Sequence, residues 1–262
     1  MKQACEIMTE LPLVFADDHV TKARQILRDD GFREVYVQDH KKRLMGYIDI
    51  TDVLQITDTK SNITVEGFLK DAVTVSPCDT LETTAQKIAK GNTDSAAVVE
   101  ANGEVLGAVL LSEIFPILIT RHELRGVVGD VMSRKVVTCA PDDHIPKIYN
   151  LIVESGFTAF PVVKNKEIIG MVSRRDILAA GRVRKSMDTT VHTKVEKNAA
   201  NIRIDSVMIT PVISIGPDAP LSEAADQLIR HDISRMPVIE NRKIEGIVDR
   251  HDVLKGLIVK TG

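Results

Sequence analysis

The 262-residue sequence predicts an α/β (α+β) fold built from four copies of a unit with the order strand, helix, strand, strand, helix. Four segments share one pattern, in which a Gly is followed by two apolar residues and, six positions after the Gly, by an acid. Upstream of each segment the same succession of strand, turn and helix signals recurs, and such repetition indicates repeated structural units. The segments are GYIDITDVL from Gly46, GAVLLSEIF from Gly107, GMVSRRDIL from Gly170 and GIVDRHDVL from Gly246.

Each unit opens with a short apolar run, which we expect to form its first strand, followed by a turn rich in Asp or Pro. A helix comes next; in the fourth copy Leu221, Ala224, Ala225 and Leu228 recur at the spacing of an amphipathic helix. A second strand, a polar turn and a third strand through the Gly follow, and a short helix carrying the acid closes the unit. The predicted opening strands are Leu13–Phe15, Val73–Val75, Val136–Thr138 and Val212–Ile215, and the second strands end at Val37, Val99, Val163 and Ile239.

A single unit is close to the size at which independent folding becomes marginal, so we expect the copies to pair as one with two and three with four. The third connection is long and polar, and carries several basic residues; it is either a solvated connector or a phosphate-binding strip. The predicted boundaries are repeat one 5–56, repeat two 65–118, repeat three 128–180, repeat four 204–257 and a polar linker 181–203.

Composition excludes several classes of protein. The net charge of −3 argues against a nucleic-acid role, and no apolar run approaches the roughly 20 residues that span a bilayer. The N-terminal residues lack the apolar stretch of a signal peptide, so we expect a cytoplasmic protein. The cysteines Cys5, Cys78 and Cys139 lack the spacing of a metal or disulfide framework, and we expect no metal site.

The four units resemble CBS domains, named for cystathionine β-synthase, over nearly the whole chain. Two consecutive copies resemble one Bateman module, and two modules in one chain resemble the γ subunit of AMP-activated protein kinase and stand-alone archaeal and bacterial CBS proteins. The resemblance implies a disc-like pair of modules with ligand clefts between paired copies. It also implies AMP, ADP, ATP or S-adenosylmethionine as ligand.

The repeated acid falls at the start of the last helix, where two interpretations compete. A carboxylate there can accept hydrogen bonds from a ribose diol while the helix N-terminus faces a phosphate. The same carboxylate can instead serve the helix end as a cap. A Ser or Thr three residues earlier favours the first interpretation, because its hydroxyl adds no negative charge.

Only the third copy has the full pattern, with Ser173, Arg174, Arg175 and Asp176. The fourth copy has Asp249 at the hydroxyl position, followed by Arg250 and Asp252, and the first has Asp49 with Asp52. The second has Leu110 with Glu113. A carboxylate at the hydroxyl position opposes a phosphate by about 1 kcal/mol in water at 4 Å, and by more in a drier cleft.

The resemblance implies that the other wall of each cleft comes from the partner copy, just before its second strand. The fourth copy has Ser234 and Arg235 there, so Arg235 is predicted to reach a phosphate across the cleft from Asp176. The Asp52 cleft faces Asp94, whose charge is expected to repel phosphate. The predicted main cleft comprises Ser173, Arg174, Arg175, Asp176, Thr210, Pro211, Val212, Ile213, Ser234, Arg235, Met236 and Pro237; a weaker second cleft comprises Val136, Val137, Thr158, Ala159, Asp249, Arg250 and Asp252; and Asp49 and Asp52 mark a third.

The sequence therefore predicts a non-enzymatic regulatory module that binds an adenine nucleotide and acts on a regulated protein yet to be identified. A module for S-adenosylmethionine and a ligand-free protein-interaction scaffold remain as alternatives, and a homodimer is left open. Arg174, Arg175 and Arg235 favour a phosphate over a sulfonium, because a fixed cation attracts the former and repels the latter. No catalytic triad, metal cluster or P-loop motif occurs, so an enzyme is not expected and no catalytic cofactor is implied.

Overall fold

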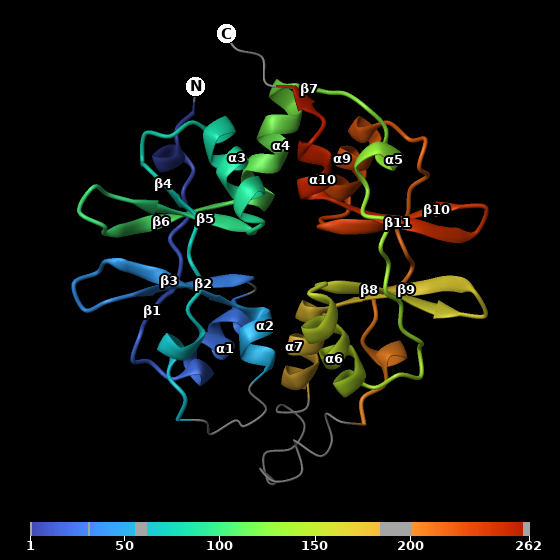
Figure 1. Ribbon diagram of the computed structural model, residues 1–262, viewed down its shortest axis with the longest axis horizontal. Coiled ribbons are helices and arrows are strands. Elements are labelled where there is room, and N and C mark those ends of the chain that lie inside the picture. The colour runs from blue at the N-terminus through green and yellow to red at the C-terminus, as the bar shows by residue number, and fades with distance from the viewer. Residues whose placement is uncertain (1, 31, 56–61, 184–200, 259–262) are drawn as a thin grey trace. The chain divides into compact units, whose positions relative to one another are not determined.

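The structure is a computed structural model that describes residues 2–30, 32–55, 62–183 and 201–258. These residues form two compact units. The first unit holds the described residues up to Arg125 together with those from Leu254 on, and the second runs from Gly126 to Val253. The first unit contains repeats one and two and the second contains repeats three and four, which confirms the predicted pairing (Figure 1).

Repeat one has the predicted order of elements. Its first helix buries Val20, Ala23 and Leu27, which lie on one face at helical spacing. The sheet has the order β1-β2-β3, with β1 parallel to β2 and β2 antiparallel to β3. The elements are the 3-10 helix η1 (Ala4–Glu6), β1 (Leu13–Phe15), α1 (Val20–Asp29), β2 (Glu34–Gln38), β3 (Leu44–Asp49) and α2 (Ile50–Leu54).

Repeat two forms a second three-stranded sheet of the same topology, with the order β4-β5-β6. Thr80 caps its first helix by accepting the Thr83 N–H at 3.2 Å, and Asn92, in the left-handed region at φ 52°, ends that helix. The elements are η2 (Val65–Phe68), β4 (Thr74–Val75), α3 (Leu81–Gly91), β5 (Ser95–Val99), β6 (Val105–Leu110) and α4 (Leu111–Arg121), followed by β7 (Glu123–Leu124), which pairs with β12 (Leu257–Ile258).

Repeats three and four each contain one antiparallel hairpin, flanked by a longer helix before it and a helix directly after it. The elements of repeat three are α5 (Val128–Val131), α6 (Ile145–Ser155), β8 (Ala159–Lys164), β9 (Glu167–Ser173) and α7 (Arg174–Val183). Those of repeat four are η3 (Ile204–Ser206), α9 (Leu221–Arg230), β10 (Arg235–Glu240), β11 (Lys243–Asp249) and α10 (Arg250–Leu254). Most of the predicted linker 181–203 lies outside the described residues.

The predicted opening strands Val136–Thr138 and Val212–Ile215 are wrong as strands. In repeat four only Ile215 forms a parallel bridge, with Val238, and in repeat three the bridge lies one residue after the predicted strand, between Cys139 and Val162. The prediction for repeats one and two is confirmed by β1 and β4.

Proline explains the difference between the two units. In repeat two the Ala97 N–H donates to the Val73 carbonyl at 2.8 Å and so holds the opening strand. The equivalent third residue of β8 is Pro161, and that of β10 is Pro237, and neither has an N–H to donate. The opening segments of repeats three and four therefore lose this ladder bond.

The two repeats of the first unit pack through their second strands. Tyr36 Oη and Ser95 Oγ lie 2.8 Å apart in the interior, and Glu34 accepts from Ser95 Oγ and, at 2.9 Å, from the Asp94 N–H. The first residues of β2 and β5 therefore face each other. Tyr36 also belongs to a core cluster with Leu11, Ala97 and Ala108.

In each unit the two repeats are also joined by their lead-in segments, which are the residues just before each opening strand or bridge. Every lead-in segment crosses to the third strand of the other repeat in its unit and exchanges two backbone hydrogen bonds with the residue after the repeated Gly. The pairs are Thr9 with Ala108, Lys70 with Tyr47, Ser133 with Ile247 and Ile209 with Met171.

The repeated Gly is explained by this crossing. A Cβ added at Gly46 would lie 2.4 Å from the Lys70 carbonyl oxygen, and one added at Gly107 would lie 2.8 Å from that of Thr9. Such distances are below van der Waals contact, so a side chain at these positions would push the lead-in segment away. In the second unit an added Cβ would meet the sulfur of the methionine that precedes the lead-in residue: Met208 for Gly170 at 2.5 Å and Met132 for Gly246 at 2.7 Å.

Within the part of the chain that the structure describes, no helix combines the length and apolar character that crossing a membrane requires.

Candidate functional site

The repeated acid occupies the same place in all four repeats, as the third residue of the last helix. In three repeats its carboxylate accepts the backbone N–H of the residue three positions earlier: Asp52 from Asp49 at 2.7 Å, Asp176 from Ser173 at 2.7 Å and Asp252 from Asp249 at 3.1 Å. The capping interpretation of these acids is therefore correct. Capping uses one face of a carboxylate, which has further lone pairs for a second partner.

In repeat three, Ser173 and Asp176 form a closed pair at the start of α7. The Ser173 hydroxyl donates to Asp176 Oδ2 at 2.7 Å, and its oxygen lies 3.4 Å from the Asp176 N–H. Among the described residues, the Asp176 carboxylate accepts hydrogen bonds only from Ser173, from its backbone N–H and from its hydroxyl. Arg174 is buried and its N–H donates to the Thr158 carbonyl at 2.9 Å, whereas Arg175 is exposed.

The segment predicted to hold an adenine begins next to this helix start. Ile209 pairs with Met171 in β9, through hydrogen bonds of 3.1 and 2.8 Å. The four residues that follow are therefore brought to the hairpin of repeat three. Thr210 and Pro211 are exposed, and Val212 and Ile213 are half-buried.

The structure places Arg235 at the start of β10, opposite Asp249 in the β10–β11 register. The equivalent pair in repeat three is Ala159 with Ser173. The Ser234 carbonyl accepts the Arg250 N–H at 3.2 Å, which fixes the start of α10. The next two residues of the predicted main cleft, Met236 and Pro237, are both buried, and Met236 belongs to the core.

The second predicted cleft carries two acids at one helix start. Asp249 Oδ1 accepts the Asp252 N–H at 3.0 Å, so the acid at the hydroxyl position is a helix cap. Val136 and Val137, both half-buried, follow the lead-in residue Ser133, whose N–H donates to the Ile247 carbonyl at 2.9 Å. The buried Arg250 extends toward Asp232, with 3.6 Å between Nη2 and Oδ1.

In repeat one, a lysine that sequence reasoning missed contacts both acids. Lys70 Nζ lies 2.9 Å from Asp52 Oδ1 and 3.3 Å from Asp49 Oδ1. Burial and the charge of Asp49 raise the pKa of the Asp52 carboxyl, and Lys70 offsets part of that rise. Lys70 stands at the position of Ile209, so an alignment of the lead-in segments as well as of the hairpins would have found it.

In repeat two the acid is also engaged by a lead-in residue. The Thr9 hydroxyl contacts both oxygens of Glu113, at 3.1 and 3.2 Å. The expected repulsion from Asp94 needs correction, because Arg33 Nη1 lies 3.0 Å from Asp94 Oδ1 and offsets its charge. Sequence reasoning missed this ion pair because the two residues belong to different repeats.

Three of the four acids thus differ in what the opposing lead-in residue offers them. Lys70 brings a cation to Asp52 and Thr9 brings a hydroxyl to Glu113. The residue in that place beside Asp176 is Ile209, which can offer neither. Ile209 is among the most exposed large apolar residues of those described, at 55%.

A family model described as the CBS domain matches residues 4–57, 128–182 and 204–259, together more than half of the chain. The chain belongs to the CBS domain family. The hairpin, the helix that carries the acid and the crossing lead-in segment therefore describe CBS repeats. The order of elements in residues 65–121 makes repeat two a fourth unit of the same architecture.

Several known proteins are similar to this CBS chain. The crystal structure of MJ1225 from Methanocaldococcus jannaschii, a proposed archaeal homologue of γ-AMPK, aligns with a TM-score of 0.80 and 17% identity, and covers 97% of this chain and 99% of that one. A protein from Pyrococcus horikoshii aligns with a TM-score of 0.63 and 20% identity over 97% and 99% of the two chains. These likenesses show the fold.

A relative with similarity along most of the sequence is the uncharacterized protein MJ1404 of Methanocaldococcus jannaschii. It is 28% identical in an alignment of 260 positions, which covers 95% of this chain and 60% of that protein. The matches to MJ1225 and MJ0188 of the same organism cover 59% and 45% of those proteins. The chain thus spans 60% or less of the length of these curated relatives.

Proposed function

We propose that this CBS protein is a non-enzymatic regulator that binds an adenine nucleotide, AMP, ADP or ATP, beside Asp176 in the second unit. The observation that carries the proposal is the contrast between Ile209 and Lys70. In repeat one a lysine already lies against Asp52 at 2.9 Å, whereas beside Asp176 the equivalent residue is an isoleucine. The carboxylate of Asp176 therefore keeps acceptor capacity for the two hydroxyls of a ribose.

The surroundings of Asp176 suit the other parts of a nucleotide. Helix α7 starts at Arg174, and the positive end of its dipole favours an anion such as a phosphate. Ile209 and the half-buried Val212 and Ile213 offer apolar surface to a base. The exposed Arg175 adds a cation at the same helix start.

The assignment of Arg235 to the phosphate rests on the symmetry between the units. In the first unit, Glu34 and Ser95 begin the second strands of their repeats and are in hydrogen-bond contact. Ala159 and Arg235 hold the same two places in the second unit. By this equivalence, we expect Arg235 to lie beside Ala159. Ala159 is in turn paired with Ser173 in the β8–β9 hairpin.

The other clefts are proposed as weaker sites. Asp249 adds a negative charge near Asp252, and Lys70 competes with a ribose for Asp49 and Asp52. S-adenosylmethionine is the second candidate ligand, since it shares the adenosine part. We also propose that the protein is cytoplasmic and that it acts on a partner protein in response to the ligand.

Calorimetric titration of the full chain with adenosine, AMP, ADP, ATP and S-adenosylmethionine tests the proposal. Ile209→Lys should weaken adenosine binding at least tenfold, about 1.4 kcal/mol, because the new cation competes for Asp176 as Lys70 does for Asp52. Asp176→Asn should have a similar effect. Arg235→Ala should weaken ATP more than adenosine, and this difference should shrink as salt rises.

Lys70→Ile is the matched control for Ile209→Lys, because it makes the opposite change in the first unit and should leave the affinity of the Asp176 site unchanged. No heat from any of the five ligands would favour the ligand-free scaffold instead. If S-adenosylmethionine bound tightly and AMP, ADP and ATP did not bind, the ligand of this site would be S-adenosylmethionine and not a nucleotide.

A further inference from the structure

The N-terminal segment lies across the turn that opens repeat two. Gln3 and Thr80 form an antiparallel bridge, and the Ala4 N–H donates to the Asp79 carbonyl at 2.9 Å. The next residue, Cys5, donates its N–H to the Pro77 carbonyl at 3.0 Å. This bond places Cys5 next to the residue that follows Pro77, which is Cys78.

The separation of the two cysteines follows from standard bond lengths. With 3.0 Å between the Cys5 nitrogen and the Pro77 oxygen, the Cα atoms of Cys5 and Cys78 can be at most about 7 Å apart. Disulfide bonds join Cα atoms that are about 4.4–6.8 Å apart. Both cysteines are exposed, so an oxidant can reach them.

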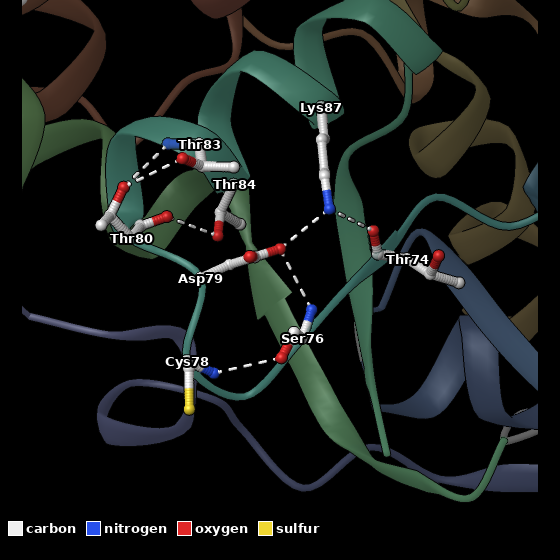
Figure 2. A network of polar contacts seen from close by, with 8 residues as sticks. All are labelled: Thr74, Ser76, Cys78, Asp79, Thr80, Thr83, Thr84 and Lys87. Carbon is white, nitrogen blue, oxygen red and sulfur yellow. Dashed lines mark hydrogen bonds and ion pairs between the residues drawn. The ribbon is translucent and has the colours of Figure 1, made fainter. Parts of the chain in front are cut away.

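The turn that carries Cys78 is held in place by a network of polar contacts, seen in Figure 2. Asp79 Oδ2 accepts from the Ser76 N–H at 3.1 Å and from Lys87 Nζ at 2.8 Å, and Ser76 Oγ lies 3.5 Å from the Cys78 N–H. The sulfur of Cys78 points away from this network, toward the blue ribbon of the N-terminal segment (Figure 2). On the other side, Ala4, the residue before Cys5, is fully buried and anchors the N-terminal segment.

We propose that Cys5 and Cys78 form a reversible intramolecular disulfide under oxidising conditions. The oxidant is a small-molecule disulfide. The thiolate of one cysteine attacks it, forms a mixed disulfide and releases one small thiol; the other cysteine then attacks the mixed disulfide and releases the second. Two protein thiols become one S–S bond, and the oxidant is reduced to two thiols. The weak contact of Cys5 Sγ with Gln3 Oε1, at 4.0 Å, is given up.

The bond would tie down the lead-in segment of repeat one. Four residues after Cys5, Thr9 pairs with Ala108 and contacts Glu113 through its hydroxyl. A covalent link at Cys5 therefore fixes a segment that borders the acid of repeat two. Oxidation would act on the first unit, whereas the nucleotide is proposed to bind beside Asp176 in the second.

The third cysteine is set apart by its surroundings. Cys139 is buried at 5% exposure in repeat three, and burial raises the pKa of its thiol to about 12. Since the thiolate is the nucleophile, Cys139 takes no part in exchange at neutral pH.

The test treats the reduced full-length protein, at low micromolar concentration and pH 8, with oxidised glutathione. Free thiols are then alkylated in denaturant and the protein is measured by intact mass and peptide mapping. The expected product is a monomer that has lost two hydrogens, alkylated only at Cys139, with one cross-linked peptide pair containing Cys5 and Cys78. Two persistent glutathione adducts on Cys5 and Cys78, or two thiols that stay free, would overturn the proposal.

Two variants sharpen this result. Cys78→Ser should give a single glutathione adduct on Cys5 and no internal bond, whereas Cys139→Ser should form the internal bond as the unchanged protein does. Hydrogen exchange of the oxidised protein should slow at the Ala4 and Cys5 amides. Exchange as fast as in the reduced protein would contradict the fixing of the lead-in segment.

Discussion

At the scale of the residue, the repeated glycines are explained by a neighbouring chain segment. The Gly107 backbone lies so close to the Thr9 carbonyl that an added Cβ would be 2.8 Å from that oxygen. Gly67 is the opposite case, since a Cβ added there would meet nothing within 4 Å.

Gly107→Ala should therefore lower the free energy of unfolding by about 1–3 kcal/mol, because the lead-in segment must move to admit the methyl group. The control Gly67→Ala should change it by less than about 0.5 kcal/mol. The measurement is the urea midpoint of the two variants. Equal effects would mean that the crossing segment does not require a glycine.

Asp49 and Asp52 allow a test of electrostatics at the same scale. The pKa of Asp52 is raised by burial and by the charge of Asp49, so between the ordinary pKa and the raised one the folded protein holds a proton that the unfolded chain has released. The free energy of unfolding contributed by Asp52 therefore falls as pH rises from the ordinary value of 3.8 through the raised one.

Asp49→Ser introduces the residue that repeat three has at the equivalent position, Ser173. It should lower the pKa of Asp52 and so reduce the fall in the free energy of unfolding as pH rises. Carboxyl-carbon NMR titration of Asp52 measures the shift directly. Asp17→Ser, which removes an acid with a 71% exposed side chain, should leave the titration of Asp52 unchanged. If Asp49→Ser also left it unchanged, burial alone would account for the raised pKa.

At the scale of the element, a polar contact links helices α3 and α4 of repeat two. His122, at the end of α4, lies with Nε2 2.9 Å from Glu82 Oε1 in the first turn of α3, and both side chains are largely buried. Burial raises the pKa of Glu82, but the hydrogen bond from His122 and other polar contacts outweigh it and hold the pKa below 4.5.

A lowered acid pKa means that the contact stabilises the fold above about pH 4.5 and that this contribution is lost as pH falls through the folded value. Glu82→Gln should therefore lower the free energy of unfolding by about 1–3 kcal/mol at pH 6, and the difference should shrink toward pH 3. Urea unfolding across this range is the measurement.

The matched control for this pair is Glu123→Gln. Glu123 pairs with Arg125 at 2.9 Å on the surface, with 45% of its side chain exposed, so its replacement should cost less than about 1 kcal/mol. A pH-independent effect of Glu82→Gln would show that packing, and not the charge, is responsible.

At the scale of the whole molecule, the chain divides into two units, but the division does not follow the sequence to its end. The described residues from Leu254 on belong to the first unit, where β12 pairs with β7. Leu254 and Leu257 pack against the core of repeat two, around Leu81, Ile114 and Leu118.

Leu257→Ala should therefore destabilise the first unit, by about 1–3 kcal/mol for a partly buried leucine. Hydrogen exchange should accelerate in α3 and α4 while α6 and α9 stay unchanged. Val153→Ala, at a 49% exposed position of α6, should change neither unit. Faster exchange in α9 after Leu257→Ala would assign the end of the chain to the second unit.

The elements were predictable where their signals are local. Helical spacing of apolar residues marked α9, and the repeated hairpin pattern marked β3, β6, β9 and β11 with the helices after them. The opening strands of repeats three and four were not predictable from their own residues, because their hydrogen bonds depend on whether the second strand has an N–H or a proline at the facing position.

The number of repeats, their order of elements and the position of each acid in the first turn of a helix could be predicted from the sequence, because these features depend on residues within a few positions of one another. Which acids have a partner in the other repeat could be seen only in the folded protein. Arg33 with Asp94 and Thr9 with Glu113 join residues 61 and 104 positions apart. Such contacts are set by how two repeats pack together, so the repeated acid is paired with Lys70 in repeat one, whereas in repeat three the equivalent lead-in residue is Ile209.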